Sequence, residues 1–285
     1  MKDLILFGDC KKTLSAFLPK SARMCVTSPP YYGLRDYGGE DEQIGQENTP
    51  EDFINNLVDV FKEVRNVLTD DGTLWVNLGD SYYNYRPGKG QSYPKQSVSK
   101  TKQDLPDKCN KRGNKLQGLK EKDLIGIPWL LAFALRKDGW YLRQDIIWNK
   151  PNPMPESVKD RCTKSHEYIF LFSKSKNYYY DNESIKEPTK EGEATKNKRS
   201  VWTVNKKPYK GAHFATFPPE LIEPCIKAGS QKGDIILDPF IGSGTTAMVA
   251  KSLGRHYIGC ELHESYNDLI QNRVSQYTIN LEDFV

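Results

Sequence analysis

The chain has 285 residues, of which 37% are hydrophobic and 27% charged, with a net charge of +4, so it can bury the core of one large domain. Its longest apolar stretch, residues 125–135, is too short to cross a bilayer, and its first nine residues are too short for a secretory signal. The six cysteines show no Cys-x-x-Cys spacing, so we expect a cytoplasmic protein with no metal site and no disulfide framework.

Short apolar runs alternate with segments of helical periodicity along most of the chain. In chain order the predicted elements are strands over 4–7 and 24–27, a helix from 49 to 68, a strand over 73–78, a helix over 127–137, strands over 141–148 and 167–172, a helix over 218–229, a strand over 235–237, a helix over 245–253 and a strand over 256–260. This alternation predicts a single α/β domain, 1–285, with a mostly parallel sheet covered on both faces. Ligands of such sheets bind beyond the carboxyl ends of the strands. The polar residues expected at those ends are Asp9, Ser28, Asp80, Asp238 and Glu261.

Two polar segments interrupt this pattern. Residues 86–122 carry eleven lysines and arginines against three acids, and a basic segment of this kind suits contact with a phosphate backbone. A solvated, disordered loop explains the same composition equally well. Residues 182–210 form the second candidate for DNA contact. The DNA-binding candidates in the basic segment are Lys89, Lys95, Lys100, Lys102, Lys108, Lys111, Arg112 and Lys115.

A glycine-rich turn, Asp238–Thr246, connects a predicted strand to a predicted helix. Gly242 and Gly244 leave room for a ligand against the backbone, and the helix that follows offers unpaired amides. The spacing fits neither a phosphate loop nor a full dinucleotide fingerprint. Glu261, at the end of the next strand, can accept hydrogen bonds from two ribose hydroxyls. The pattern favours an adenosine ligand, although a glycine-rich turn also permits tight strand-to-helix packing.

A second turn, Ser28-Pro29-Pro30-Tyr31, follows the strand over 24–27. Two prolines fix the direction of the backbone and leave carbonyl oxygens unpaired. The Pro29 carbonyl and the Ser28 hydroxyl can accept the two N–H bonds of an exocyclic amine, while Tyr31 stacks on the ring of the base. Taken alone, the segment is more readily explained as an ordinary turn with Tyr31 in the core.

Together, Thr27–Tyr31 and Asp238–Thr246 resemble the motifs of the DNA amino-methyltransferases, specifically the permuted β-group in which the catalytic motif precedes the cofactor motif. The resemblance extends over nearly the whole chain and includes residues 5–10, 148–155, 165–170 and 213–218. It implies a class I, Rossmann-like methyltransferase fold, circularly permuted, with a seven-stranded sheet and an inserted basic target-recognition region. It also implies S-adenosyl-L-methionine, a flipped-out base and direct methyl transfer to an amine, without a metal.

The resemblance also assigns roles to residues. The catalytic set is Ser28, Pro29, Pro30 and Tyr31. The cofactor-binding set is Asp9, Phe214, Ala215, Thr216, Asp238, Pro239, Phe240, Gly242, Gly244, Thr245, Thr246 and Glu261. Asp9 is expected near the adenine, residues 214–216 over the methionine end, and Phe240 against the cofactor.

Ser at position 28 is the form that the family associates with cytosine, whereas Asp usually accompanies adenine. We therefore favour N(4)-cytosine over N(6)-adenine as the target in double-stranded DNA. The alternatives from other classes are a non-catalytic DNA-binding relative and a methyltransferase for RNA or a small amine. A cognate restriction endonuclease is a candidate partner, no membrane is involved, and the expected state is a monomer or homodimer.

Overall fold

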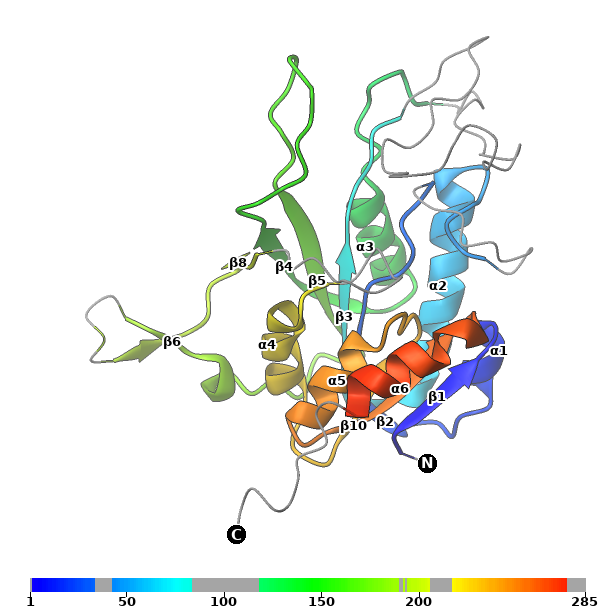
Figure 1. Ribbon diagram of the computed structural model, residues 1–285, viewed down its shortest axis with the longest axis vertical. Coiled ribbons are helices and arrows are strands. Elements are labelled where there is room, and N and C mark those ends of the chain that lie inside the picture. Colours follow the sequence, from blue (N-terminus) through cyan, green and yellow to red (C-terminus); the bar gives the residue numbers. More distant parts are fainter. Residues whose placement is uncertain are drawn as a thin grey trace.

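The structure, a computed structural model, describes residues 2–33, 43–83, 118–189, 192, 194–205 and 217–275. An eight-stranded sheet runs through the described chain in the order β1-β10-β9-β2-β3-β5-β4-β8 (Figure 1). The first five strands are parallel, β5 is antiparallel to both of its neighbours, and β8 is parallel to β4. The strand bounds are β1 Leu4–Phe7, β2 Ala22–Thr27, β3 Leu68–Leu78, β4 Tyr141–Asn149, β5 His166–Ser173, β8 Val201–Thr203, β9 Ile235–Asp238 and β10 His256–Glu261.

Helices cover both faces of the sheet, as the sequence predicts. Because side chains alternate along a strand, Cys25 contributes to one core while Met24 and Val26 contribute to the other. The first core includes residues of α1 Cys10–Ser15, α2 Pro50–Val67 and α3 Ile127–Lys137. The second includes residues of α4 Pro219–Gly229, α5 Thr245–Ser252 and α6 Asn267–Ser275. No described helix is long and apolar enough to cross a membrane.

The start of α2 shows how local sequence determines an element here. The Thr49 side chain accepts a hydrogen bond from the Asp52 amide at 3.0 Å, and Pro50 occupies the first turn, where its missing N–H costs nothing. From there α2 places eight buried residues along one stripe. The helix therefore begins where the sequence predicts and anchors the first core.

Three local features differ from the sequence prediction. The sheet has eight strands and not seven, because the short β8 pairs with the edge of β4. β3 begins at Leu68 and not at Thr73, since Asp71-Gly72 lies in an irregularity where the register with β2 shifts. The short helices α1 and α6 were not predicted. The 182–210 region contains one turn of 3-10 helix, Glu183–Ile185, and a two-stranded sheet of β6 Glu187–Pro188 and β7 Thr195–Lys196, and its residues 206–210 are not described.

Residues 84–117, most of the basic segment, lie outside the described residues, but the chain on either side of them is joined by hydrogen bonds. Tyr82 and Leu124 form an antiparallel bridge. The Tyr83 amide donates to the Asp123 carbonyl at 2.8 Å, and the Lys122 amide donates to the Tyr83 carbonyl at 2.9 Å. The segment thus leaves and re-enters the domain at one place, directly after β3.

Candidate active site

The carboxyl ends of the five parallel strands meet at one edge of the sheet, which we call the rim. Phe7 of β1 pairs with Glu261 of β10, whose Gly259 pairs with Asp238 of β9. Next in the sheet, Cys25 of β2 pairs with Leu237 of β9, and Thr27 pairs with Val76 of β3. The prediction that the polar strand-end residues share one edge is therefore confirmed.

A buried carboxylate joins the two predicted turns at the rim. Asp238, 1% exposed, accepts hydrogen bonds from the Thr27 hydroxyl at 2.6 Å and the Thr246 hydroxyl at 2.6 Å. The Phe240 amide donates to the same carboxylate at 3.0 Å. Burial raises the pKa of Asp238 to about 6, while the hydroxyl and amide donors act in the opposite direction. Asp238 thus holds the glycine-rich turn to Thr27, the residue just before Ser28.

The glycine-rich turn has the backbone that its sequence requires. Gly242 and Gly244 have φ of +51° and +81°, a region that residues with a side chain rarely adopt. A Cβ on Gly244 would also lie 3.0 Å from Ile270 Cγ2 of α6. The turn therefore feeds directly into α5, and the predicted residues Pro239, Phe240, Thr245 and Thr246 all lie within it or in the first turn of that helix.

Two polar atoms beside this turn suit a bound adenosyl group. The Thr245 hydroxyl and His263 Nε2 are buried and have no hydrogen-bond partner among the described residues, a costly arrangement that a ligand would relieve. At the end of β10, the Glu261 carboxylate accepts a hydrogen bond from the His263 amide at 3.0 Å. Burial raises the pKa of Glu261, and amide bonds from His263 and Gly242 lower it. The donor set fits the predicted cofactor, and His263 is not among the cofactor-binding residues expected from the sequence.

The predicted catalytic turn follows β2, the strand next to β9 in the sheet. Pro29 is buried, whereas Ser28, Pro30 and Tyr31 are partly exposed. The Tyr31 hydroxyl donates to Glu167 Oε2 at 2.6 Å. The ring lies so close to Gly79 that a Cβ there would be 2.7 Å from Tyr31 Cε2. Burial, followed by the Glu167 charge, raises the pKa of Tyr31 well above its ordinary value.

Sequence reasoning missed the group that surrounds the Tyr31 hydroxyl. Lys150, 6% exposed, forms an ion pair with Glu167, and the Asn77 side-chain amide donates to Glu167 Oε2 at 3.2 Å. Each of these residues stands at the rim end of its strand, because β5 is antiparallel to β3 and β4. The available signal was their position next to predicted strand ends.

Two predicted strand-end acids have local structural roles. Asp9 caps α1 by accepting from the Lys11 amide at 3.0 Å. Asp80 accepts from the amides of Gly126 and Ile127 at 3.0 and 3.1 Å and so caps α3. Both follow the rim ends of their strands, and the role of Asp9 near the adenine stays a prediction.

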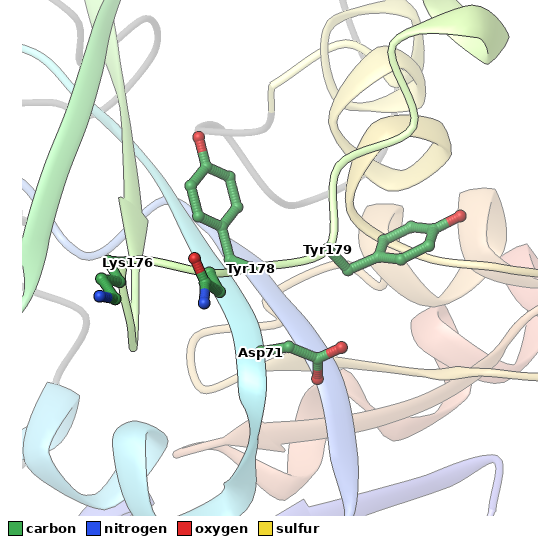
Figure 2. A pocket seen from close by; sticks show the side chains of 5 residues that line it. Asp71, Lys176, Tyr178 and Tyr179 are labelled. Atoms are coloured by element: carbon green, nitrogen blue, oxygen red, sulfur yellow. The ribbon is translucent and has the colours of Figure 1, made fainter.

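A hollow of about 510 Å³ lies away from the rim (Figure 2). It is lined by Asp71 near the start of β3 and by residues 176–179, which follow β5. The Tyr179 amide donates to the Asp71 carbonyl at 3.0 Å, so these tyrosines lie at the opposite edge of the sheet. The hollow is separate from the candidate active site.

Several predicted site residues lie outside the described residues: Phe214, Ala215 and Thr216 of the cofactor set, and all the DNA-binding candidates from Lys89 to Lys115. No group of three or more potential metal ligands occurs in the described parts of the chain. Cys225 is buried inside α4 and belongs to the second core.

Comparison with known proteins agrees with this geometry. The family model described as DNA methylase, N6_N4_Mtase, matches residues 22–272. The Type II methyltransferase M.Cfr9I of Citrobacter freundii is 52% identical over 274 residues, which cover 96% of this chain and 88% of that protein. Among solved structures, the PvuII DNA methyltransferase (cytosine-N4-specific) shares the fold with a TM-score of 0.70 at 19% identity, over 99% of this chain and 90% of its own. The M1.HpyAVI–SAM complex matches with a TM-score of 0.58 at 19% identity, over 94% and 98% of the two chains. The chain thus has a class I methyltransferase fold and belongs to the N6/N4 DNA methylase family, the DNA amino-methyltransferases.

Proposed function

We propose that this DNA methyltransferase transfers a methyl group from S-adenosyl-L-methionine to the N(4) amine of a flipped cytosine in double-stranded DNA. The observation that carries the proposal is the pair of 2.6 Å hydrogen bonds through which Asp238 joins Thr27 to Thr246. They hold the predicted catalytic turn beside the predicted cofactor turn. A base held by the first turn would therefore lie next to a methyl group held by the second.

Bound S-adenosyl-L-methionine supplies an electrophilic methyl group on a sulfonium. The chain's own residues then have three tasks. The glycine-rich turn, with Thr245, Glu261 and His263, binds the adenosyl part. Ser28 and the Pro29 carbonyl accept the N–H bonds of the amine, which fixes its lone pair toward the methyl group. Tyr31, held between Gly79 and Glu167, limits where the base can lie.

Cytosine is favoured over adenine by Ser28, the residue associated with cytosine in this family. The fold shared with an enzyme named as cytosine-N4-specific is compatible with this choice. N(6)-adenine is the second candidate, because both bases present a similar amine to the same acceptors.

Nucleoside mass spectrometry tests the assignment. Purified chain is incubated with duplex DNA and methyl-labelled S-adenosyl-L-methionine, and the DNA is digested. We expect N(4)-methylcytosine from the wild type and none from Ser28→Ala, whose cofactor affinity should stay nearly unchanged. N(6)-methyladenine as the sole product would reject the cytosine assignment, and label transferred only to RNA would reject the DNA substrate.

We further place the enzyme in a cytoplasmic Type II restriction–modification system, with a cognate endonuclease as partner. The name of the 52% identical relative supports this placement. The lysines and Arg112 of the basic segment are proposed as phosphate contacts, and their charge is the reason.

A further inference from the structure

The turn over residues 28–31 is attached to the domain at both of its ends. Just before it, the Thr27 hydroxyl donates to Asp238 of β9 at 2.6 Å. At its end, the Tyr31 hydroxyl donates to Glu167 of β5 at 2.6 Å. In the sheet, β9 lies on one side of β2 and β5 lies beyond β3 on the other side. The two carboxylates therefore stand on strands at opposite sides of the turn, and only Asp238 belongs to the predicted cofactor set.

Three neighbouring strands build the second attachment. Lys150, directly after β4, forms an ion pair with one oxygen of Glu167. The other oxygen accepts from Tyr31 and, at 3.2 Å, from the side-chain amide of Asn77 on β3. The Tyr31 ring also lies against the Gly79 backbone, where a Cβ would be 2.7 Å from Cε2. The position of Tyr31 is therefore fixed in the free protein.

Folding alone does not account for the ion pair. Lys150 is 6% exposed, and removing two charges from water costs about as much as their attraction returns, so a buried ion pair adds little net stability. What the contacts do fix is geometry, because Lys150 and Asn77 together hold the Glu167 carboxylate in one orientation. Burial raises the pKa of the Tyr31 phenol well above its ordinary value, so Tyr31 keeps its proton and donates. The result is a short hydrogen bond of fixed direction at the end of the turn.

This inference rests on the function proposed above. We propose that Glu167, held by Lys150, is a positioning residue for methyl transfer that fixes the end of the turn over 28–31, as Asp238 fixes its start. Tyr31 then acts through its hydroxyl, as an anchor, in addition to its ring. With both ends attached, the turn is in place before the base arrives, so the amine meets the methyl group without reordering of the turn. The contribution of this anchor should therefore appear in the rate of transfer and not in cofactor binding.

Tyr31→Phe is the first test, because it keeps the ring and removes only the bond to Glu167. A hydrogen bond to a charged group is worth a factor of about 10 to 100, and a displacement of about 1 Å can cost about 10²-fold in rate. We therefore expect the single-turnover rate at saturating duplex DNA and cofactor to fall by about tenfold or more. The dissociation constants of DNA and cofactor should stay within about twofold of those of the wild type.

A matched pair of double variants separates the anchor from the charges. Lys150→Met/Glu167→Gln removes both charges but keeps a side-chain oxygen that can accept from Tyr31. Lys150→Met/Glu167→Leu removes this oxygen as well, and Asn77 keeps its bond to the Tyr168 carbonyl at 3.1 Å. Neither variant leaves one charge of the pair buried without the other. We expect the second variant to transfer methyl groups about tenfold more slowly than the first, since only the second lacks the acceptor for the Tyr31 hydroxyl.

Tyr32→Phe is the control for Tyr31→Phe. Both tyrosines pack against the first core, but the Tyr32 hydroxyl donates to the Asn48 carbonyl at 3.4 Å, so we expect a rate within about twofold of the wild type. Urea unfolding of each variant without ligand identifies any that does not fold. Tyr31→Phe removes one hydroxyl only and decides the test by itself where a double variant fails to fold.

A wild-type rate in Tyr31→Phe overturns the anchor, as do equal rates in the two double variants. A weaker cofactor affinity that accounts for the whole loss of rate also overturns it, because the cluster would then support the cofactor site. A wild-type chain that methylates adenine rejects only the cytosine assignment, since the turn serves the amine of either base. A wild-type chain that methylates no DNA overturns both proposals, whereas an active wild type with unaffected variants rejects the anchor alone.

Discussion

The hydrogen bond between Thr27 and Asp238 offers a direct measurement of how the two turns are joined. Thr27→Val keeps the shape of a fully buried side chain and removes one of three donors to the carboxylate. A buried hydrogen bond to a charged group contributes about 1.5–3 kcal/mol, and one to a neutral group about 1 kcal/mol. Because the pKa of Asp238 is about 6, the carboxylate is ionised at pH 7.5 and protonated at pH 5 in the folded chain. We expect the variant to lose about 2 kcal/mol of unfolding free energy at pH 7.5 and about 1 kcal/mol at pH 5.

Urea unfolding of the free protein at the two pH values measures this difference. Thr246→Val is the matched control, since it removes an equally short bond to the other oxygen of Asp238. Both variants should lose similar stability, but Thr27→Val should slow methyl transfer more, because Thr27 directly precedes the turn that we propose as catalytic. An equal loss of stability at both pH values, or an equal loss of rate in the two variants, would refute this reasoning.

Three further outcomes follow from the site. Burial raises the pKa of Asp238 from 3.8 to about 6. Between pH 4 and pH 6 the folded chain therefore binds a proton that the unfolded chain does not. The contribution of this group to the free energy of unfolding should rise as the pH falls from 7 to 4, by at most about 3 kcal/mol. In unfolding experiments at a series of pH values, Asp238→Asn should not show this rise. The same pH dependence of stability in the wild type and in Asp238→Asn would contradict the prediction. Gly242→Val should abolish cofactor binding measured by calorimetry. Gly233→Ala is the control: Gly233 has a φ of +84° and precedes β9 at the end away from the rim, so this change also strains the backbone but should leave cofactor binding intact. Replacing the lysines of residues 86–122 with glutamine should weaken DNA binding and flatten its dependence on salt, and an unchanged slope would show that the segment makes no phosphate contacts.

Much of the framework could be predicted from sequence because its signals are local. The start of α2 depends on Thr49 and Pro50, and α3 ends at Lys137, just before Asp138-Gly139, where a helix stop is expected. The two turns could be placed on one rim because parallel strands share a direction. The resemblance to a known family added roles for Ser28 and Asp238, which stay predictions.

The parts that could not be predicted depend on pairing between distant segments. Lys150 and Glu167 are 17 positions apart, and Tyr31 and Glu167 are 136 apart, so no spacing rule connects them. They meet because β4 and β5 pair with Asn149 opposite His166, and β5 lies against β3. The short β8 and the helices α1 and α6 carry too few buried residues to stand out from polar segments.

The hydrogen bonds between residues 82–83 and 122–124 have a consequence for how much the basic segment can change. The domain itself holds the two ends of the basic segment together. The entropic cost of closing a connection between two fixed ends grows only with the logarithm of its length, by about 0.6 kcal/mol per doubling. Insertions, deletions or exchange of the stretch between them would leave the sheet and the chemistry at its edge intact. The basic segment, which we propose as the DNA contact, can therefore vary in sequence and length without any change at the rim.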